Sequence, residues 1–127
     1  MAVTKGVTTA GITELVKLTG AFGSPVEFDY IAVGEGSGAY AAGDTTLTTE
    51  ITTSGLERVQ VTPTAAATHT IQWTNDFSVT GSKTITELGI LNDATTGFLL
   101  LRIAGLSTPV ENGYTYTPTI TMKFTSA

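Results

Sequence analysis

The sequence contains no cysteine, a single histidine and few charged residues. Because there is no cysteine, disulfide bonds, thiolate zinc sites and thiol nucleophiles are excluded. Charged residues make up 13% of the chain, about half the usual share of roughly 25%. The apolar runs are shorter than the ~18 residues that a membrane-spanning helix needs, so no membrane partner is expected. The chain has 127 residues, which is long enough to bury a hydrophobic core without covalent cross-links.

Positive charge is also scarce, with six Lys and Arg against eleven Asp and Glu and a net charge of −5. A protein binds nucleic acid by displacing counterions from phosphates with Lys and Arg. The basic residues here are scattered, so no nucleic-acid partner is expected. The N-terminus lacks the apolar core of a signal peptide, and synthesis in a cytoplasm is therefore expected.

Threonine is the abundant residue, at 27 of 127 positions. Its β-branched side chain favours strands. The pattern is clearest over residues 114–125, where apolar residues alternate with threonine almost without interruption. This alternation predicts a strand with one buried face and one threonine face. Pro118 has no N–H to donate, so an edge or a bulge is expected at that point.

One helix is predicted, over residues 9–20, where apolar residues follow helical spacing. Thr9 is the expected N-cap, and Gly20 is expected just past the helix end. Pro25 keeps the residue before it out of the helical region, which separates the helix from the first long predicted strand. The predicted buried face consists of Ile12, Leu15, Val16 and Leu18.

The rest of the chain is predicted to form short strands separated by turns such as Asn112-Gly113. We expect strands over residues 26–33, 56–64, 68–79, 84–91, 98–104 and 114–125. The predicted fold is mainly β: an antiparallel β-sandwich or jelly-roll-like barrel with one short N-terminal helix. Residues 1–127 are expected to be a single domain, with an N-terminal arm at 1–8 and a long Gly/Ala/Thr-rich loop at 34–49.

Three patterns have some likeness to catalytic or ligand sites. The glycines of 34–39 lack the following helix that a dinucleotide-binding loop requires. His69 alternates with Ile71 in a strand-like run and has no nucleophile elbow near it. Glu27 and Asp29 lie on one face of a predicted strand, where a solvated surface explains them. No catalytic, cofactor or metal residue is therefore predicted, and the chain is expected not to be an enzyme. Whether a structural ion is bound at an interface between subunits is left open.

The run Phe98–Leu101 is apolar on both faces of its predicted strand. Such a strand is covered on both sides, by a second sheet, by the helix or by another subunit. A central core strand and an oligomer interface are both consistent with this pattern.

The order of these segments resembles a family of small virion structural proteins in tailed bacteriophages and related prokaryotic viruses. The similarity extends from Val7 to Phe124, and it concerns strands, turns and loops. The sequence departs from the family's pattern at Tyr114, where an aspartate is common, and at Pro118. The motifs that carry it are YIAVGEG at 30–36, DTTLTTEI at 44–51, ITELGILND at 85–93 and ENGYTYTPTI at 111–120.

The resemblance implies a non-enzymatic component of the virion, made in the host cytoplasm and present in many copies. A capsid decoration or cement protein is the first expectation, and a tail or fibre component that contacts the host is the alternative. A small carbohydrate-active enzyme is the remote third. The expected partners are further copies, most simply as a trimer, and other virion proteins such as the major capsid protein. Contact residues are expected on the arm and loop: Ala2, Val3, Val7, Tyr40, Leu47 and Ile51.

Overall fold

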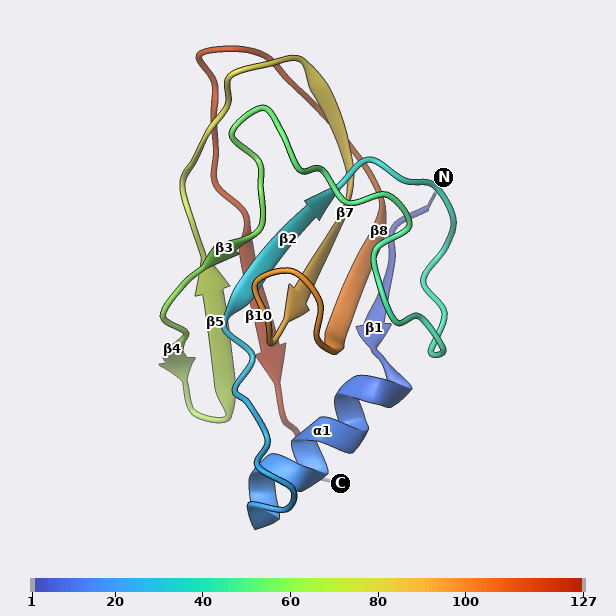
Figure 1. Ribbon diagram of the computed structural model, residues 1–127, viewed down its shortest axis with the longest axis vertical. Helices are drawn as coiled ribbons and strands as arrows, with labels where there is room; N and C mark the ends of the chain where they lie inside the picture. Colours follow the sequence, from blue (N-terminus) through green and yellow to red (C-terminus); the bar gives the residue numbers. More distant parts are fainter. Residues whose placement is uncertain (1, 127) are drawn as a thin grey trace.

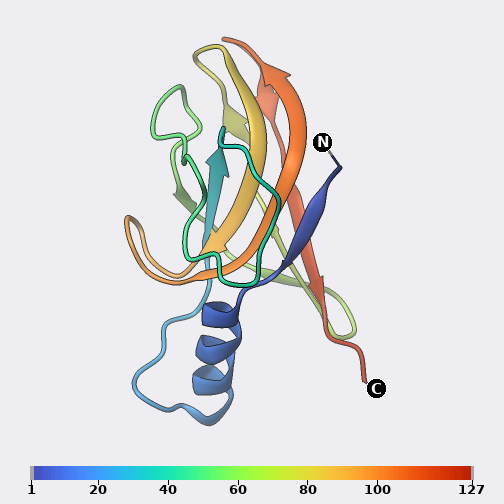
Figure 2. The same ribbon diagram turned by 90° about the vertical axis from the view of Figure 1, so that its right-hand side faces the viewer.

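Two antiparallel layers of strands face each other in the computed structural model, which describes residues 2–126 (Figures 1 and 2). The first layer is a curved five-stranded sheet in the order β1-β8-β7-β2-β3. Every pair of neighbours in this sheet is antiparallel. The strands are β1 (Thr4–Val7), β2 (Tyr30–Gly34), β3 (Val59–Gln60), β7 (Lys83–Leu91) and β8 (Leu99–Val110).

The second layer consists of a three-stranded sheet, β10-β5-β4, and a two-stranded ladder, β6-β9. The strand pairing continues from one part to the other without a shift. Thr74 pairs with Thr119, and three residues further along each strand Phe77 pairs with Tyr116. Pro118 lies between β9 and β10, and β10 is an edge strand of its sheet, which confirms the predicted edge at this proline. The strands are β4 (Thr64–Ala67), β5 (Thr70–Thr74), β6 (Phe77–Ser78), β9 (Thr115–Tyr116) and β10 (Thr119–Lys123).

This architecture confirms the predicted mainly-β class and corresponds to the sandwich rather than the barrel. Several predicted boundaries were wrong. The strand expected at 26–33 begins only at Tyr30, and His69 lies in the turn between β4 and β5, with φ 63°. Strand β8 continues six residues beyond the predicted end at 104, because Gly105 takes φ 80° and the β7–β8 register shifts nearby. A bulge of this kind lets a strand continue after its alternating pattern is lost.

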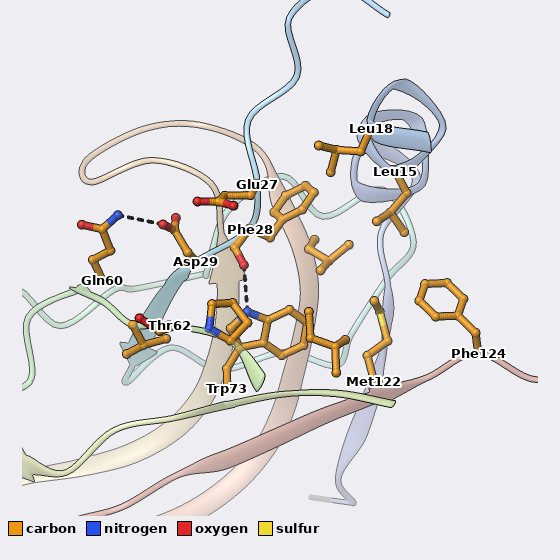
Figure 3. A pocket seen from close by; sticks show the side chains of 14 residues that line it. Leu15, Leu18, Glu27, Phe28, Asp29, Gln60, Thr62, Trp73, Met122 and Phe124 are labelled. Carbon is orange, nitrogen blue, oxygen red and sulfur yellow. Dashed lines mark hydrogen bonds between the residues drawn. The ribbon is translucent and has the colours of Figure 1, made fainter. Parts of the chain in front are cut away.

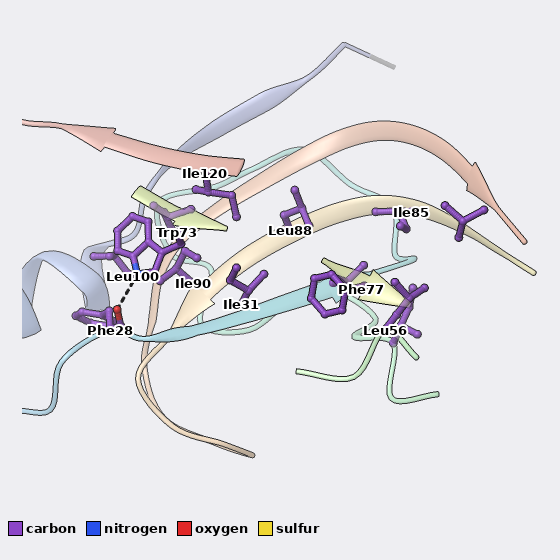
Figure 4. Packing of buried hydrophobic residues seen from close by; sticks show 14 of the residues in the cluster. Phe28, Ile31, Leu56, Trp73, Phe77, Ile85, Leu88, Ile90, Leu100 and Ile120 are labelled. Atoms are coloured by element: carbon purple, nitrogen blue, oxygen red, sulfur yellow. Dashed lines mark hydrogen bonds between the residues drawn. The ribbon is translucent and has the colours of Figure 1, made fainter. Parts of the chain in front are cut away.

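The main core lies between the two layers (Figure 4). Trp73 of β5 is 1% exposed, and its indole N–H donates a hydrogen bond to the Phe28 carbonyl at 2.8 Å. A second, smaller cluster, Ala32, Leu47, Leu91 and Leu99, lies under the long loop. Strand β8 contributes to both clusters and is paired on both sides, so Phe98–Leu101 continues into a central strand and three of its residues are buried.

Helix α1 (Thr9–Gly20) has the predicted bounds, but its caps and two of the four residues of its predicted buried face were predicted wrongly. The N-cap is Thr8, and Ala21 takes the left-handed conformation at the C-cap. The helix contacts β8 through Gly11, where an added Cβ would lie 2.5 Å from the Leu100 carbonyl oxygen. This close approach orients Ile12 outward, together with Val16, while Leu15 and Leu18 remain half-buried.

The N-cap gives a direct test of this geometry. The buried Thr8 hydroxyl accepts a hydrogen bond from the Gly11 N–H at 2.9 Å and donates one to the Leu99 carbonyl. Thr8→Ala is expected to lower the free energy of unfolding by about 1–2 kcal/mol. The matched control is Thr9→Ala, at an exposed position one residue later, which should change it by less than about 0.5 kcal/mol. Urea unfolding of both variants measures the difference, and equal losses would contradict the assignment of Thr8.

Candidate functional site

The long loop after β2 is fixed by the buried carboxylate of Glu87 in β7. This side chain is 0% exposed. It accepts backbone hydrogen bonds from Gly36 at 3.0 Å, Thr48 at 2.9 Å and Thr49 at 2.8 Å. The three N–H groups come from both ends of the loop, so one carboxylate joins its beginning to its end.

Arg102 of β8 completes this anchor. Its Nε donates to Glu87 at 2.9 Å, and its Nη1 lies 3.1 Å from the Asp44 carboxylate. The guanidinium also donates to the carbonyls of Gly38 and Ala39. A guanidinium presents five donors in a fixed fork, and here most of them are directed to the loop. The ion pair therefore has a structural role, and the sequence signal for it was a charged residue in the apolar run LLLRI.

Most of the predicted contact residues make their contacts within the chain. Tyr40 is half-buried; its hydroxyl donates to the Val7 carbonyl, and its N–H donates to the Thr4 hydroxyl at 2.8 Å. Leu47 is 5% exposed and Ile51 is 1% exposed, both within the hydrophobic core. The prediction that Leu47 and Ile51 face neighbouring subunits was wrong, because the loop folds back over β7 and places them inside.

The expected N-terminal arm is largely a strand. Residues Thr4–Val7 form β1 and pair with β8, and Thr8 caps the helix. Ala2 and Val3 are exposed and stay available for contacts. Deletion of the whole arm would therefore remove an edge strand and a cap, rather than a free contact segment.

Instead, large apolar side chains are exposed around the helix. The helix lies beside the turn that carries Phe98, since the Lys17 ammonium is 6.0 Å from the centre of the Phe98 ring. The Phe22 ring lies against Gly20 at the end of the helix. Five large apolar side chains on and beside the helix have exposed fractions from 47% to 63%. We name this set the helix-end surface: Ile12, Val16, Phe22, Val26 and Phe98.

The turn that carries Phe98 is well anchored. The Phe98 N–H donates to the Asn92 side chain at 2.8 Å. Arg58 donates to the carbonyls of Asp93 at 2.9 Å and Thr96 at 2.8 Å. Backbone hydrogen bonds from Thr96 and the residue before it hold the pKa of Asp93 below its usual range. Phe98 is thus presented on a turn with a defined conformation.

A groove of about 790 Å³ separates α1 from the strands of the second layer (Figure 3). Its floor includes the buried Phe28, Trp73 and Leu100, and its walls include Leu15 and Leu18 of the helix. Such a volume is in the range of pockets that bind organic ligands. The groove was not predicted from the sequence, because its lining residues come from six separate segments.

The groove also contains the carboxylates of Glu27 and Asp29. Glu27 is exposed at its rim, whereas Asp29 is 6% exposed and accepts a hydrogen bond from the Gln60 amide at 2.7 Å. The prediction that both residues lie on a solvated surface was therefore wrong for Asp29. His69 is exposed at a hairpin tip and does not line the groove.

Within residues 2–126, no three acidic or histidine side chains lie close enough together to hold a metal ion. No helix of this part of the chain is long and apolar enough to cross a membrane. Comparisons of the chain with protein-family models, with curated proteins and with solved structures found no match.

Proposed function

We propose that the chain is a non-enzymatic structural protein of a virion, and that it acts as a capsid decoration or cement protein. The observation that carries this proposal is the helix-end surface. Large exposed apolar patches mark contacts with other proteins, and five large apolar side chains on and beside α1 are 47% to 63% exposed. The low charge of the chain, 13% of residues, also suits close packing among neighbours. The resemblance to small virion proteins supports the same class.

A partner protein would bury this surface without reordering the subunit. Ile12 and Val16 project from a helix that is capped and packed on β8, and Phe98 projects from the anchored turn. A rigid contact surface loses little conformational entropy on binding. Self-association, expected as a trimer, would use the same side chains, because Leu99, Leu100 and Leu101 are buried within the chain.

The alternative is a tail or fibre component that contacts the host. Exposed aromatic residues favour it, since Phe22 is 63% exposed and Phe98 is 47% exposed, and aromatic side chains are enriched at recognition surfaces. Cryo-electron microscopy of the particle distinguishes the two roles. Density for this chain on the capsid lattice supports the cement role, and density at the tail supports the alternative.

The triple variant Ile12→Ser, Val16→Ser, Phe22→Ser tests the proposed surface. These side chains are more than half exposed, so the variant should fold and melt like the parent. Its association with particles should fall about tenfold or more, because apolar anchors at an interface each contribute about 1 kcal/mol or more. Co-sedimentation with particles that lack the protein measures this loss.

The control for this variant is the threonine face of the second layer. Thr115→Asp and Thr121→Asp change exposed residues of β9 and β10. They should leave particle association unchanged. If these substitutions abolish association while the triple variant binds normally, the contact surface is the threonine face and the helix-end surface is not used.

A further inference from the structure

The groove beside α1 combines an apolar end with an acidic end. Figure 3 shows Met122 and Phe124 on one side and the carboxylates of Glu27 and Asp29 on the other. The floor between them includes Trp73. Phe124 and Glu27 are exposed at the rim, so the groove is open to solvent. A ligand that fills it would be apolar over most of its length and polar at one end.

The acidic end lacks a matching cation. Neither Glu27 nor Asp29 forms a salt bridge with a basic side chain of residues 2–126. None of the residues that line the groove is Lys, Arg or His. Asp29 is 6% exposed, and its one side-chain hydrogen bond comes from the neutral Gln60 amide. Buried carboxylates are normally paired with a positive charge, so the groove is electrostatically complementary to a cation.

We propose that this groove binds a segment of a neighbouring protein in which apolar side chains precede a lysine or arginine. The apolar side chains would lie between Leu18 and Met122, and the cation would lie between Glu27 and Asp29. An open groove that accepts several consecutive side chains fits an extended peptide. This inference rests on the proposed function in one respect, which is that the segment belongs to another protein of the particle.

Trp73 is the only tryptophan of the chain and lies on the groove floor, so its fluorescence reports occupancy. The probe is acetyl-Leu-Leu-Lys-amide. Two matched peptides carry norleucine or glutamate in place of the lysine. The lysine peptide should give a saturable change in emission. The norleucine peptide should bind about tenfold more weakly, on the scale of one charge-assisted hydrogen bond, and the glutamate peptide should not bind measurably.

Asp29→Asn should reduce the affinity of the lysine peptide about tenfold and leave that of the norleucine peptide unchanged. The asparagine oxygen can still accept the hydrogen bond from Gln60. Glu27→Gln, at an exposed position that cannot affect folding strongly, should act in the same direction and replaces the first variant if that one does not fold. The control is Asp76→Asn, at an exposed carboxylate outside the groove, which should bind all peptides like the parent.

Three results would overturn the inference. The absence of any response to the lysine peptide would exclude the site. Equal responses to all three peptides would show an apolar cleft without charge selection. A change in emission with protein concentration alone would show that a second copy fills the groove. Because these measurements use no particles, their failure would leave the proposed virion role intact, and loss of that role would show instead in the co-sedimentation experiment.

Discussion

Replacing Glu87 with alanine should lower the free energy of unfolding by about 3–5 kcal/mol, the usual cost of removing one partner from a buried ion pair. Arg102, which is 2% exposed, would keep only the Asp44 carboxylate as a charged partner. The N–H groups of Gly36, Thr48 and Thr49 would also lose their acceptor. Chemical unfolding, followed by the fluorescence of Trp73, measures the change.

The matched control is Lys83→Ala, which removes the pair between Lys83 and Glu35 at 3.3 Å on the same layer. Both of these side chains are partly exposed, and exposed ion pairs contribute about 0–1 kcal/mol. Arg102→Met should resemble Glu87→Ala, since it leaves the carboxylate buried without its cation. If Glu87→Ala costs no more than Lys83→Ala, the loop is not held by this pair and the packing of Leu47 must account for its position.

The features that local sequence patterns decide were predicted well. The bounds of α1 follow from the apolar spacing within residues 9–20, although both caps were predicted wrongly. The exposed threonine face of the last strand follows from alternation, and Thr119 and Thr121 are indeed exposed. Local signals sufficed because neighbouring residues alone determine these features.

The errors arose where distant residues decide the outcome. The outward orientation of Ile12 and Val16 depends on contact between Gly11 and Leu100, which lie 89 positions apart. The long loop was expected to contact neighbouring proteins; its anchor within the chain, Glu87 with Arg102, comes from strands far along the sequence and left no local signal. Glu87 could have been suspected, since it shares a strand face with the apolar Leu91. The groove has no local signal, because no single segment contains more than a few of its lining residues.

The loop and arm were expected to make contacts, but they form part of the subunit's own structure, while the exposed apolar residues lie around the helix. Contact surfaces are therefore better sought in rigid exposed apolar groups than in glycine-rich segments of this chain. The groove contacts α1 through Leu15 and Leu18, and no residue of the helix-end surface lines it, so the two proposed sites use different side chains.

Leu100→Asp and Ile120→Asp are each expected to cost several kcal/mol, on the scale of about 3–5 for an uncompensated buried charge. Leu100 is 1% exposed under the helix, and Ile120 is 2% exposed between the layers (Figure 4). Both side chains belong to the main hydrophobic core, so an aspartate at either position would replace an apolar group that packs against other apolar groups. We expect both variants to be unfolded or strongly destabilised, as measured by circular dichroism and thermal unfolding.

Thr119→Asp is the matched control, because it places the same charge on the adjacent residue of β10, where the side chain is exposed. Successive residues of a strand point to opposite faces, so this aspartate should remain in water and change stability by less than about 1 kcal/mol. A folded Ile120→Asp together with an unfolded Thr119→Asp would mean that β10 is inverted. Since the Trp73–Ile120 pairing fixes the register of β10 on β5, that result would also displace Met122 from the groove, and the peptide site would have to be assigned again.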